Sequence, residues 1–152
     1  MSSDKKSLTC IFCDIVSSSA PAHKMYEDDA CVAFLDTRPI RPGHSLIIPK
    51  THVDHFFDLD DNTSHHLISV ARKLSGKIRE ELTPLRVGIV ISGFGVPHCH
   101  VHVIPLHSDH DITSSQYADK KTSEPVFAVE NITPAKPTKL KMIRAKLNMM
   151  TP

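Results

Sequence analysis

The segment from His98 to Pro105 reads His-Cys-His-Val-His-Val-Ile-Pro, and its first five residues carry histidine at every second position. Successive side chains of a β-strand point to opposite faces of a sheet. A strand here therefore places His98, His100 and His102 on one face, with about 6.6–7 Å between backbones two residues apart. Their imidazoles can converge on one phosphate or one metal ion. Histidine is only intermediate in burial preference, so the row indicates a functional site rather than core packing.

The rest of the chain predicts an α+β fold: an antiparallel β meander with one long helix, followed by a C-terminal extension with a short helix. A period of three and four residues marks the long helix, 60–82, which Asp60 or Asp61 caps and Pro84 ends. We expect a helical turn at 10–16, strands at 24–27, 31–35, 45–48, 86–91 and 98–104, loops at 36–43 and 107–125, and a peripheral helix at 139–149.

Composition excludes several classes of protein. The 152 residues suit one domain, and a net charge of +1 gives no reason to expect a nucleic-acid or membrane partner. No apolar run approaches the roughly 18–20 residues of a membrane span, and no apolar segment follows the N-terminal lysines as in a secretory signal. The four cysteines do not form the pattern of a secreted disulfide framework. We therefore expect a cytoplasmic protein with reduced thiols.

Two chemistries fit the histidine row. Neutral imidazole is a common zinc ligand, so the row could hold an open metal site. Alternatively, one imidazole attacks phosphorus while its neighbours handle protons. A histidine nucleophile needs one ring nitrogen held as a hydrogen-bond donor, so that the other presents a free lone pair. His100, between two imidazoles, suits that role best.

Cys10-Ile11-Phe12-Cys13 is a second candidate element. A single C-x-x-C is compatible with half of a zinc site, a redox pair or two buried thiols. The redox interpretation requires a strand-to-helix setting within a βαβ unit, which the chain does not offer. Zinc requires two further ligands, and the histidine-rich remainder of the chain can supply them.

The segment 42–52, Pro-Gly-His-Ser-Leu-Ile-Ile-Pro-Lys-Thr-His, places a histidine at each end of a short strand. We interpret His44 as a turn histidine bonded to the backbone, whereas His52 fits both a structural and a functional role. The remaining histidines of the long helix and the later loop are interpreted as solvated: His65, His66, His107 and His110.

Segments 42–52 and 98–105 together resemble the histidine triad (HIT) family. Cys-Ile-Phe-Cys-Asp-Ile near the N-terminus and Ala-Phe-Leu-Asp at 33–36 also match it, in the same order along the chain. The resemblance covers roughly residues 10 to 105. It implies a disordered tail over 1–9, a HIT-like catalytic domain over 10–106 and a C-terminal extension over 107–152.

Members of this family hydrolyse or transfer nucleoside monophosphates from phosphoramidates, acyl-adenylates and dinucleoside polyphosphates, and they form homodimers with a sheet joined across the interface. The resemblance makes His100 the nucleophile that forms a nucleotidyl-imidazole, and His102 a partner of the phosphate and leaving group. It places Asp36 at the ribose hydroxyls. The apolar cleft for the base would consist of Ile11, Phe12, Ile15 and Phe34.

One branch of the family binds zinc through an N-terminal C-x-x-C. The resemblance then implies one structural zinc per subunit, held by Cys10, Cys13, His52 and His98, and no organic cofactor. Four protein ligands make the closed set that a structural zinc site requires. In that case His98 takes no direct part in the chemistry.

The turn at 92–97, Ser-Gly-Phe-Gly-Val-Pro, departs from the family pattern. Many members carry Asn and then a longer loop ending in Gly-Gln-Ser or Gly-Gln-Thr. Here Ser92 falls near the Asn and is the expected substrate-binding residue, while Phe94 and Gly95 replace the Gln and the hydroxyl residue. His102 stands where the transferase branch has Gln, which favours hydrolysis. We therefore expect a nucleotide phosphoramidase or related nucleotidyl hydrolase. The alternatives are a dinucleoside polyphosphate hydrolase, a nucleotide-binding scaffold with little activity, and an open-site zinc enzyme.

Overall fold

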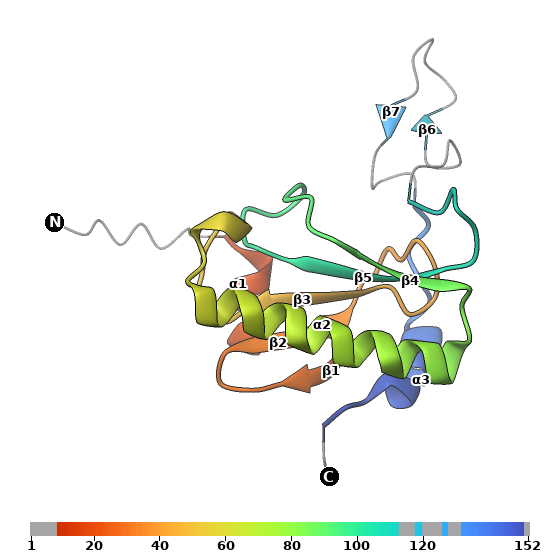
Figure 1. Cartoon of the computed structure of the whole chain (residues 1–152), viewed down its shortest axis with the longest axis horizontal. Helices are drawn as coiled ribbons and strands as arrows, with labels where there is room; N and C mark the ends of the chain where they lie inside the picture. Colours follow the sequence, from red (N-terminus) through yellow and green to blue (C-terminus); the bar gives the residue numbers. More distant parts are fainter. Residues whose placement is uncertain (1–8, 113–117, 120–125, 128–131, 151–152) are drawn as a thin grey trace, which may run out of the picture.

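The computed structural model describes residues 9–112, 118–119, 126–127 and 132–150, so the tail expected over 1–9 lies almost entirely outside the described residues. A five-stranded sheet forms the centre of the molecule, and all its neighbouring strands are antiparallel (Figure 1). Its spatial order is β1 (Lys24–Glu27), β2 (Cys31–Leu35), β3 (Ser45–Pro49), β5 (Val101–Leu106) and β4 (Arg86–Val90). The helices are α1 (Ile11–Val16), the 3-10 turn η1 (Phe56–Asp58), α2 (Asp61–Leu82) and α3 (Pro137–Leu147). This architecture confirms the α+β fold expected from the sequence.

The long helix α2 crosses one face of the sheet (Figure 1). Its N-cap is Asp60, whose side chain accepts a 2.9 Å hydrogen bond from the Thr63 N–H. Thr83 ends it in the left-handed conformation, one residue before Pro84. The apolar stripe that gives the helix its predicted period lies against the core: Leu82 is partly buried, and five residues are fully buried, namely Leu67, Val70, Ala71, Leu74 and Ile78. Its period of three to four residues is thus the pattern of a helix with one face in the core.

The two faces of the sheet differ in character. Cys31, Ala33, Leu35, Ile47, Val101 and Val103 point toward α2 and belong to the larger apolar cluster. Val32, Phe34, Leu46 and Ile48 point the other way and pack with the N-terminal helix α1. His102 alternates with Val101 and Val103 and therefore faces the α1 side. The period of two along each strand thus separates a core face from a face that carries histidines.

The predicted histidine strand is shorter than expected, because β5 begins at Val101 and not at His98. Its pairing with β3 covers only Ser45–Ile47 opposite Val103–Val101. Before that point the backbone bonds to loops: the Cys99 N–H donates to the Val53 carbonyl at 2.6 Å. Cys99 nevertheless packs in the α2-side cluster, so the predicted alternation of faces extends beyond the strand.

The sequence suggested a peripheral C-terminal helix, but α3 is part of the core. Leu140, Ile143 and Leu147 are buried in the same cluster as the stripe of α2. The Arg144 Nε–H also donates to the Lys24 carbonyl of β1 at 2.8 Å. The segment predicted as a loop over 107–125 contains the short strand β6 (Ala118–Asp119), which pairs with β7 (Val126–Phe127). Within the described ranges, no helix has the length and apolar character of a membrane span.

His66 is a further correction, because the sequence suggested that it is solvated. It is half-buried, and its Nε2 lies 2.6 Å from Asp28 Oδ2. The Tyr26 hydroxyl donates to the same carboxylate, and these bonds lower the pKa of Asp28 although burial opposes them. Asp28 thereby links the β1–β2 turn to α2. His65, His107 and His110 are exposed as predicted.

Candidate active site

A cleft of about 400 Å³ opens on the α1 side of the sheet. One wall is apolar, and the Phe12 ring packs edge-on against Phe34 with centroids 5.7 Å apart. Ile11, Phe12, Ile15, Phe34, Asp36, His100 and His102 all line it. The structure thus brings together every substrate-binding and catalytic residue proposed from the sequence except Ser92. Ser92 is exposed and is not part of the cleft wall.

His100 is oriented by the backbone of the residue two positions before it. Its Nδ1 lies 2.8 Å from the His98 carbonyl oxygen, which can only accept a hydrogen bond, so Nδ1 carries the proton. The other nitrogen, Nε2, then keeps its lone pair. The ring is buried, and Phe12 packs edge-on against it at 5.3 Å. This is the tautomer that a nucleophilic imidazole requires.

His102 is oriented by a second imidazole, that of His44. The Ile40 N–H donates to His44 Nδ1 at 3.1 Å, and His44 Nε2 lies 2.9 Å from His102 Nδ1. Burial lowers the pKa of His44 to about 3, and burial together with the nearby His100 lowers that of His102 to about 4, so both rings are neutral at pH 7. His44 Nδ1 is therefore an acceptor, its Nε2–H donates to His102 Nδ1, and His102 carries its own proton on Nε2.

The sequence analysis assigned His44 only a contact with the backbone. That contact exists, but the bond to His102 was missed. Leu46 lies opposite His102 in the β3–β5 register, so His44, two residues before Leu46, is its diagonal neighbour on the same face. The period of two was visible in the sequence, whereas the pairing of β3 with β5 was not.

Asp36 begins the loop that follows β2 and carries the carboxylate of the cleft. Its Oδ1 accepts the Arg38 N–H at 2.8 Å, and its Oδ2 lies 3.6 Å from His44 Nε2. Burial raises the pKa of Asp36, while the hydrogen bond from Arg38 opposes that rise. A half-buried carboxylate beside the imidazoles can accept hydrogen bonds from ligand hydroxyls.

Residues of the C-terminal third fix this loop from outside. The Ala135 N–H donates to the Thr37 carbonyl at 2.9 Å, and the Arg38 guanidinium donates to the Ile132 carbonyl at 2.9 Å. The position of the cleft carboxylate thus depends on a segment that the family-like motifs do not include.

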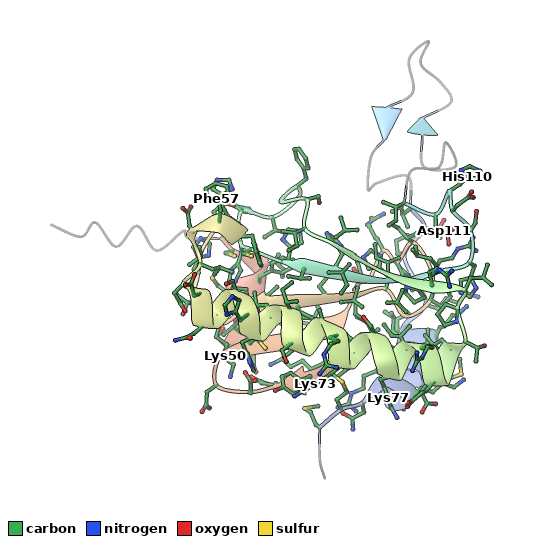
Figure 2. All side chains as sticks on the ribbon, in the orientation of Figure 1. Lys50, Phe57, Lys73, Lys77, His110 and Asp111 are labelled. Carbon is green, nitrogen blue, oxygen red and sulfur yellow. The ribbon has the colours of Figure 1, made fainter. Side chains whose placement is uncertain are left out.

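An ion pair at 2.7 Å between Arg41 and Asp111 adds a further attachment of the loop. Asp111 is buried in the turn after β5 (Figure 2), where its carboxylate also accepts the N–H groups of His107 and Ser108. The hydrogen bond from Arg41 lowers the pKa of Asp111 more than any other contact does.

A candidate metal centre lies next to the cleft, with ligand atoms from four residues: Cys10, Cys13, His52 and His98. Cys13 Sγ lies 3.2 Å from His52 Nδ1 and 3.6 Å from His98 Nδ1, and the two Nδ1 atoms are 3.2 Å apart. A tetrahedral zinc ion with ordinary Zn–S and Zn–N bonds places its ligand atoms about 3.3–3.8 Å apart. The His98 Nε2–H donates to the Pro49 carbonyl at 2.9 Å, which leaves Nδ1 free as a ligand. The residues therefore fit zinc.

The turn before the histidines contains no polar side chain after Ser92. Gly93 and Gly95 adopt positive φ angles of 76° and 95°. Phe94 stands between them with 85% of its surface exposed, and it lines the cleft. The altered turn noted in the sequence is therefore part of the cleft wall.

Comparison with known proteins identifies the family. A family model described as the HIT domain matches residues 17–109. The chain belongs to the HIT family. Protein hit of Bacillus subtilis is 34% identical to it over 107 residues, covering 67% of this chain and 74% of that protein. The adenosine 5′-monophosphoramidase hnt1 of Schizosaccharomyces pombe is 34% identical over 99 residues, covering 64% of this chain and 74% of that protein.

A solved structure of a zinc-bound relative agrees with the fold. The Zn-bound histidine triad family protein from Mycobacterium smegmatis is 31% identical to this HIT protein and superposes with a TM-score of 0.68, covering 93% of this chain and 94% of that one. Zinc is also a metal whose usual ligands are the cysteine sulfurs and histidine nitrogens gathered at the candidate metal centre of this chain.

Proposed function

We propose that this HIT protein hydrolyses nucleoside monophosphate derivatives, above all adenosine phosphoramidates, through a covalent nucleotidyl-histidine on His100. The observation that carries the proposal is the 2.8 Å contact between His100 Nδ1 and the His98 carbonyl, because it leaves the Nε2 lone pair available in a nucleotide-sized cleft. Membership of a family of nucleotide hydrolases supports the class of reaction. The phosphoramidase activity in the name of the fission-yeast relative supports the choice of substrate.

Two displacements make up the reaction. In the first, the lone pair of His100 Nε2 forms a bond to phosphorus, and the P–N bond breaks with its electron pair going to the leaving nitrogen, which takes up a proton from water. The Nε2–H of His102 donates a hydrogen bond to the phosphoryl group as charge develops there. In the second, a water oxygen bonds to phosphorus, the bond to His100 breaks, and the proton of that water passes to solvent.

The remainder of the nucleotide fits the cleft by its chemistry. The base lies against the apolar wall formed by Ile11, Phe12, Ile15 and Phe34, which offers contact area but no pattern of polar groups that selects one base. The ribose hydroxyls donate to the carboxylate of Asp36. Discrimination between ribose and deoxyribose should therefore exceed discrimination between bases.

We further propose that Cys10, Cys13, His52 and His98 hold one structural zinc ion per subunit, with no organic cofactor. Bound zinc would tie the N-terminal helix to the segment that enters β5. His98 connects this site to the chemistry through its backbone, since its carbonyl oxygen orients His100. The zinc-bound mycobacterial structure supports this assignment.

We also propose a cytoplasmic homodimer that acts on a small nucleotide and has no nucleic-acid or membrane partner. The edge strand β4 supports the dimer, because Ile89 on it and Ile91 just after it are 44% and 39% exposed. An open edge with apolar side chains favours pairing with a second chain. Sedimentation of the purified protein tests this proposal.

The experiment is turnover of adenosine phosphoramidate by the wild type, by His100→Ala and by the matched control His65→Ala, an exposed histidine on α2. We expect His100→Ala to lose about 10³-fold or more in kcat and the control to lose nothing. Equal activity in all three would refute the proposed role of His100. Nucleotide binding without turnover in the wild type would favour the scaffold function that the altered 92–97 turn suggests.

A further inference from the structure

Phe94 is the most exposed large apolar residue in the described part of the chain, with 85% of its surface open, and it lies at the cleft that holds His100 and His102. Full burial of a phenylalanine side chain is worth about 1.5–3 kcal/mol. Its ring therefore has apolar surface available for a ligand that enters the cleft.

The backbone around Phe94 serves to present this ring. Gly93 and Gly95 have positive φ angles, and the positions where their Cβ atoms would stand have no neighbour within 4 Å. Glycine is thus required there by the turn geometry and not by close packing. Of the two side chains that this turn contributes to the cleft, Val96 packs partly buried against the α1-side cluster, whereas Phe94 is exposed.

The nucleobase has other partners. Phe12 and Phe34 are buried, packed edge-on and continuous with the core, so they form a rigid wall. If the base lies on that wall and the ribose lies at Asp36, as proposed above, the leaving group extends from the phosphate toward the remaining wall of the cleft, to which Phe94 contributes.

We propose, on the basis of the proposed function, that Phe94 determines leaving-group specificity by packing against an amine that carries an aromatic ring, so that the preferred substrates are nucleoside phosphoramidates of arylalkylamines.

Charge supports this class of leaving group. Arg38 is the lysine or arginine among the residues that line the cleft, and it lies beside Asp36. Its guanidinium donates a hydrogen bond to the Ile132 carbonyl. The 92–97 turn carries no charged side chain. The polyphosphate chain of a dinucleotide would thus meet an aromatic ring where it needs a cation, whereas the ring of an arylalkylamine can stack on Phe94.

The test compares two substrates: adenosine phosphoramidate with an unsubstituted amine, and its derivative with 2-phenylethylamine. We expect the wild type to prefer the aromatic derivative in kcat/KM. We expect Phe94→Ala to lower the ratio of the two kcat/KM values about fivefold to tenfold, and Phe94→Tyr to preserve it. The matched control is Phe57→Ala, an 80% exposed aromatic on η1 (Figure 2) that is not among the cleft-lining residues, and it should leave both values unchanged.

A ratio that is the same in wild type and Phe94→Ala overturns the inference while leaving the proposed function intact. An equal loss for both substrates also overturns it, because the ring would then act on the catalytic turn in general. A shift of Phe94→Ala from dimer to monomer in sedimentation, with an unchanged ratio, would assign the ring to a subunit interface. Cleavage of neither substrate by the wild type would overturn the proposed function as well.

Discussion

Replacing His44 by alanine is expected to lower kcat for adenosine phosphoramidate roughly 10- to 100-fold, with little change in KM. His44 is buried behind His102 and is not part of the cleft wall, so nucleotide binding does not depend on it directly. Its removal deletes the 2.9 Å bond that orients His102 and fixes its tautomer. His44→Gln is the matched variant, because its amide can still donate to His102 and should restore part of kcat.

The pH dependence of the free energy of unfolding provides a second, quantitative prediction for His44. The pKa of His44 is about 3 in the folded protein, against about 6.5 for an unperturbed histidine. Between these values the unfolded chain binds one more proton at this position, so stability falls as the pH decreases below about 6.5. At pH 5 the loss from His44 alone amounts to roughly 2 kcal/mol.

Urea denaturation of wild type and His44→Gln at pH 7 and pH 5 measures this difference. Glutamine does not titrate, so the wild type should lose roughly 2 kcal/mol more than the variant between the two pH values. Equal losses in both proteins would show that His44 is not held neutral by burial. Unchanged kcat in His44→Ala would refute its action through His102.

Three further predictions concern other parts of the molecule. Protein purified without added metal should contain one zinc per subunit, and the double variant Cys10→Ser, Cys13→Ser should contain none. A chelator should reduce the stability of the protein more than it reduces the activity per folded molecule. Zinc retained in the double variant would contradict the proposed site. Replacing the ribose of the substrate by 2′-deoxyribose should lower kcat/KM by an amount equivalent to about 1–3 kcal/mol, because the carboxylate of Asp36 loses a hydrogen-bond donor. Equal kcat/KM values for both sugars would contradict the placement of Asp36 at the ribose. Asp111→Asn should lower the free energy of unfolding by about 1.5–3 kcal/mol in urea denaturation, whereas the exposed neighbour Asp109→Asn should change it little; equal effects would contradict the loop attachment.

The sequence predicted the central part of the fold well because its patterns are local. Strands 24–27 and 31–35 were predicted with their observed bounds, since the turn residues 28–30 separate two short segments that contain apolar residues. The helix 60–82 followed from a long stripe with a cap and a proline stop. That His102 faces the opposite side of the sheet from Val101 and Val103 could be predicted from the two-residue period of a strand alone.

The features that the sequence missed depend on contacts between distant segments. The bond from His44 to His102 requires the register of β3 against β5. The burial of α3 requires the cluster shared with α2, to which Leu140 and Leu147 contribute. The four proposed zinc ligands come from three separate segments, and only the family resemblance connected them before the structure did.

The most direct test of the central claim is a crystal structure of the protein after brief exposure to adenosine phosphoramidate. We predict a phosphorus atom bonded to His100 Nε2, with Nδ1 still donating to the His98 carbonyl. The same nucleotidyl group should be detected by mass spectrometry of acid-quenched wild type and be missing in His100→Ala. Phosphorus bonded to another residue, or labelling of His100→Ala at the wild-type level, would contradict the covalent mechanism.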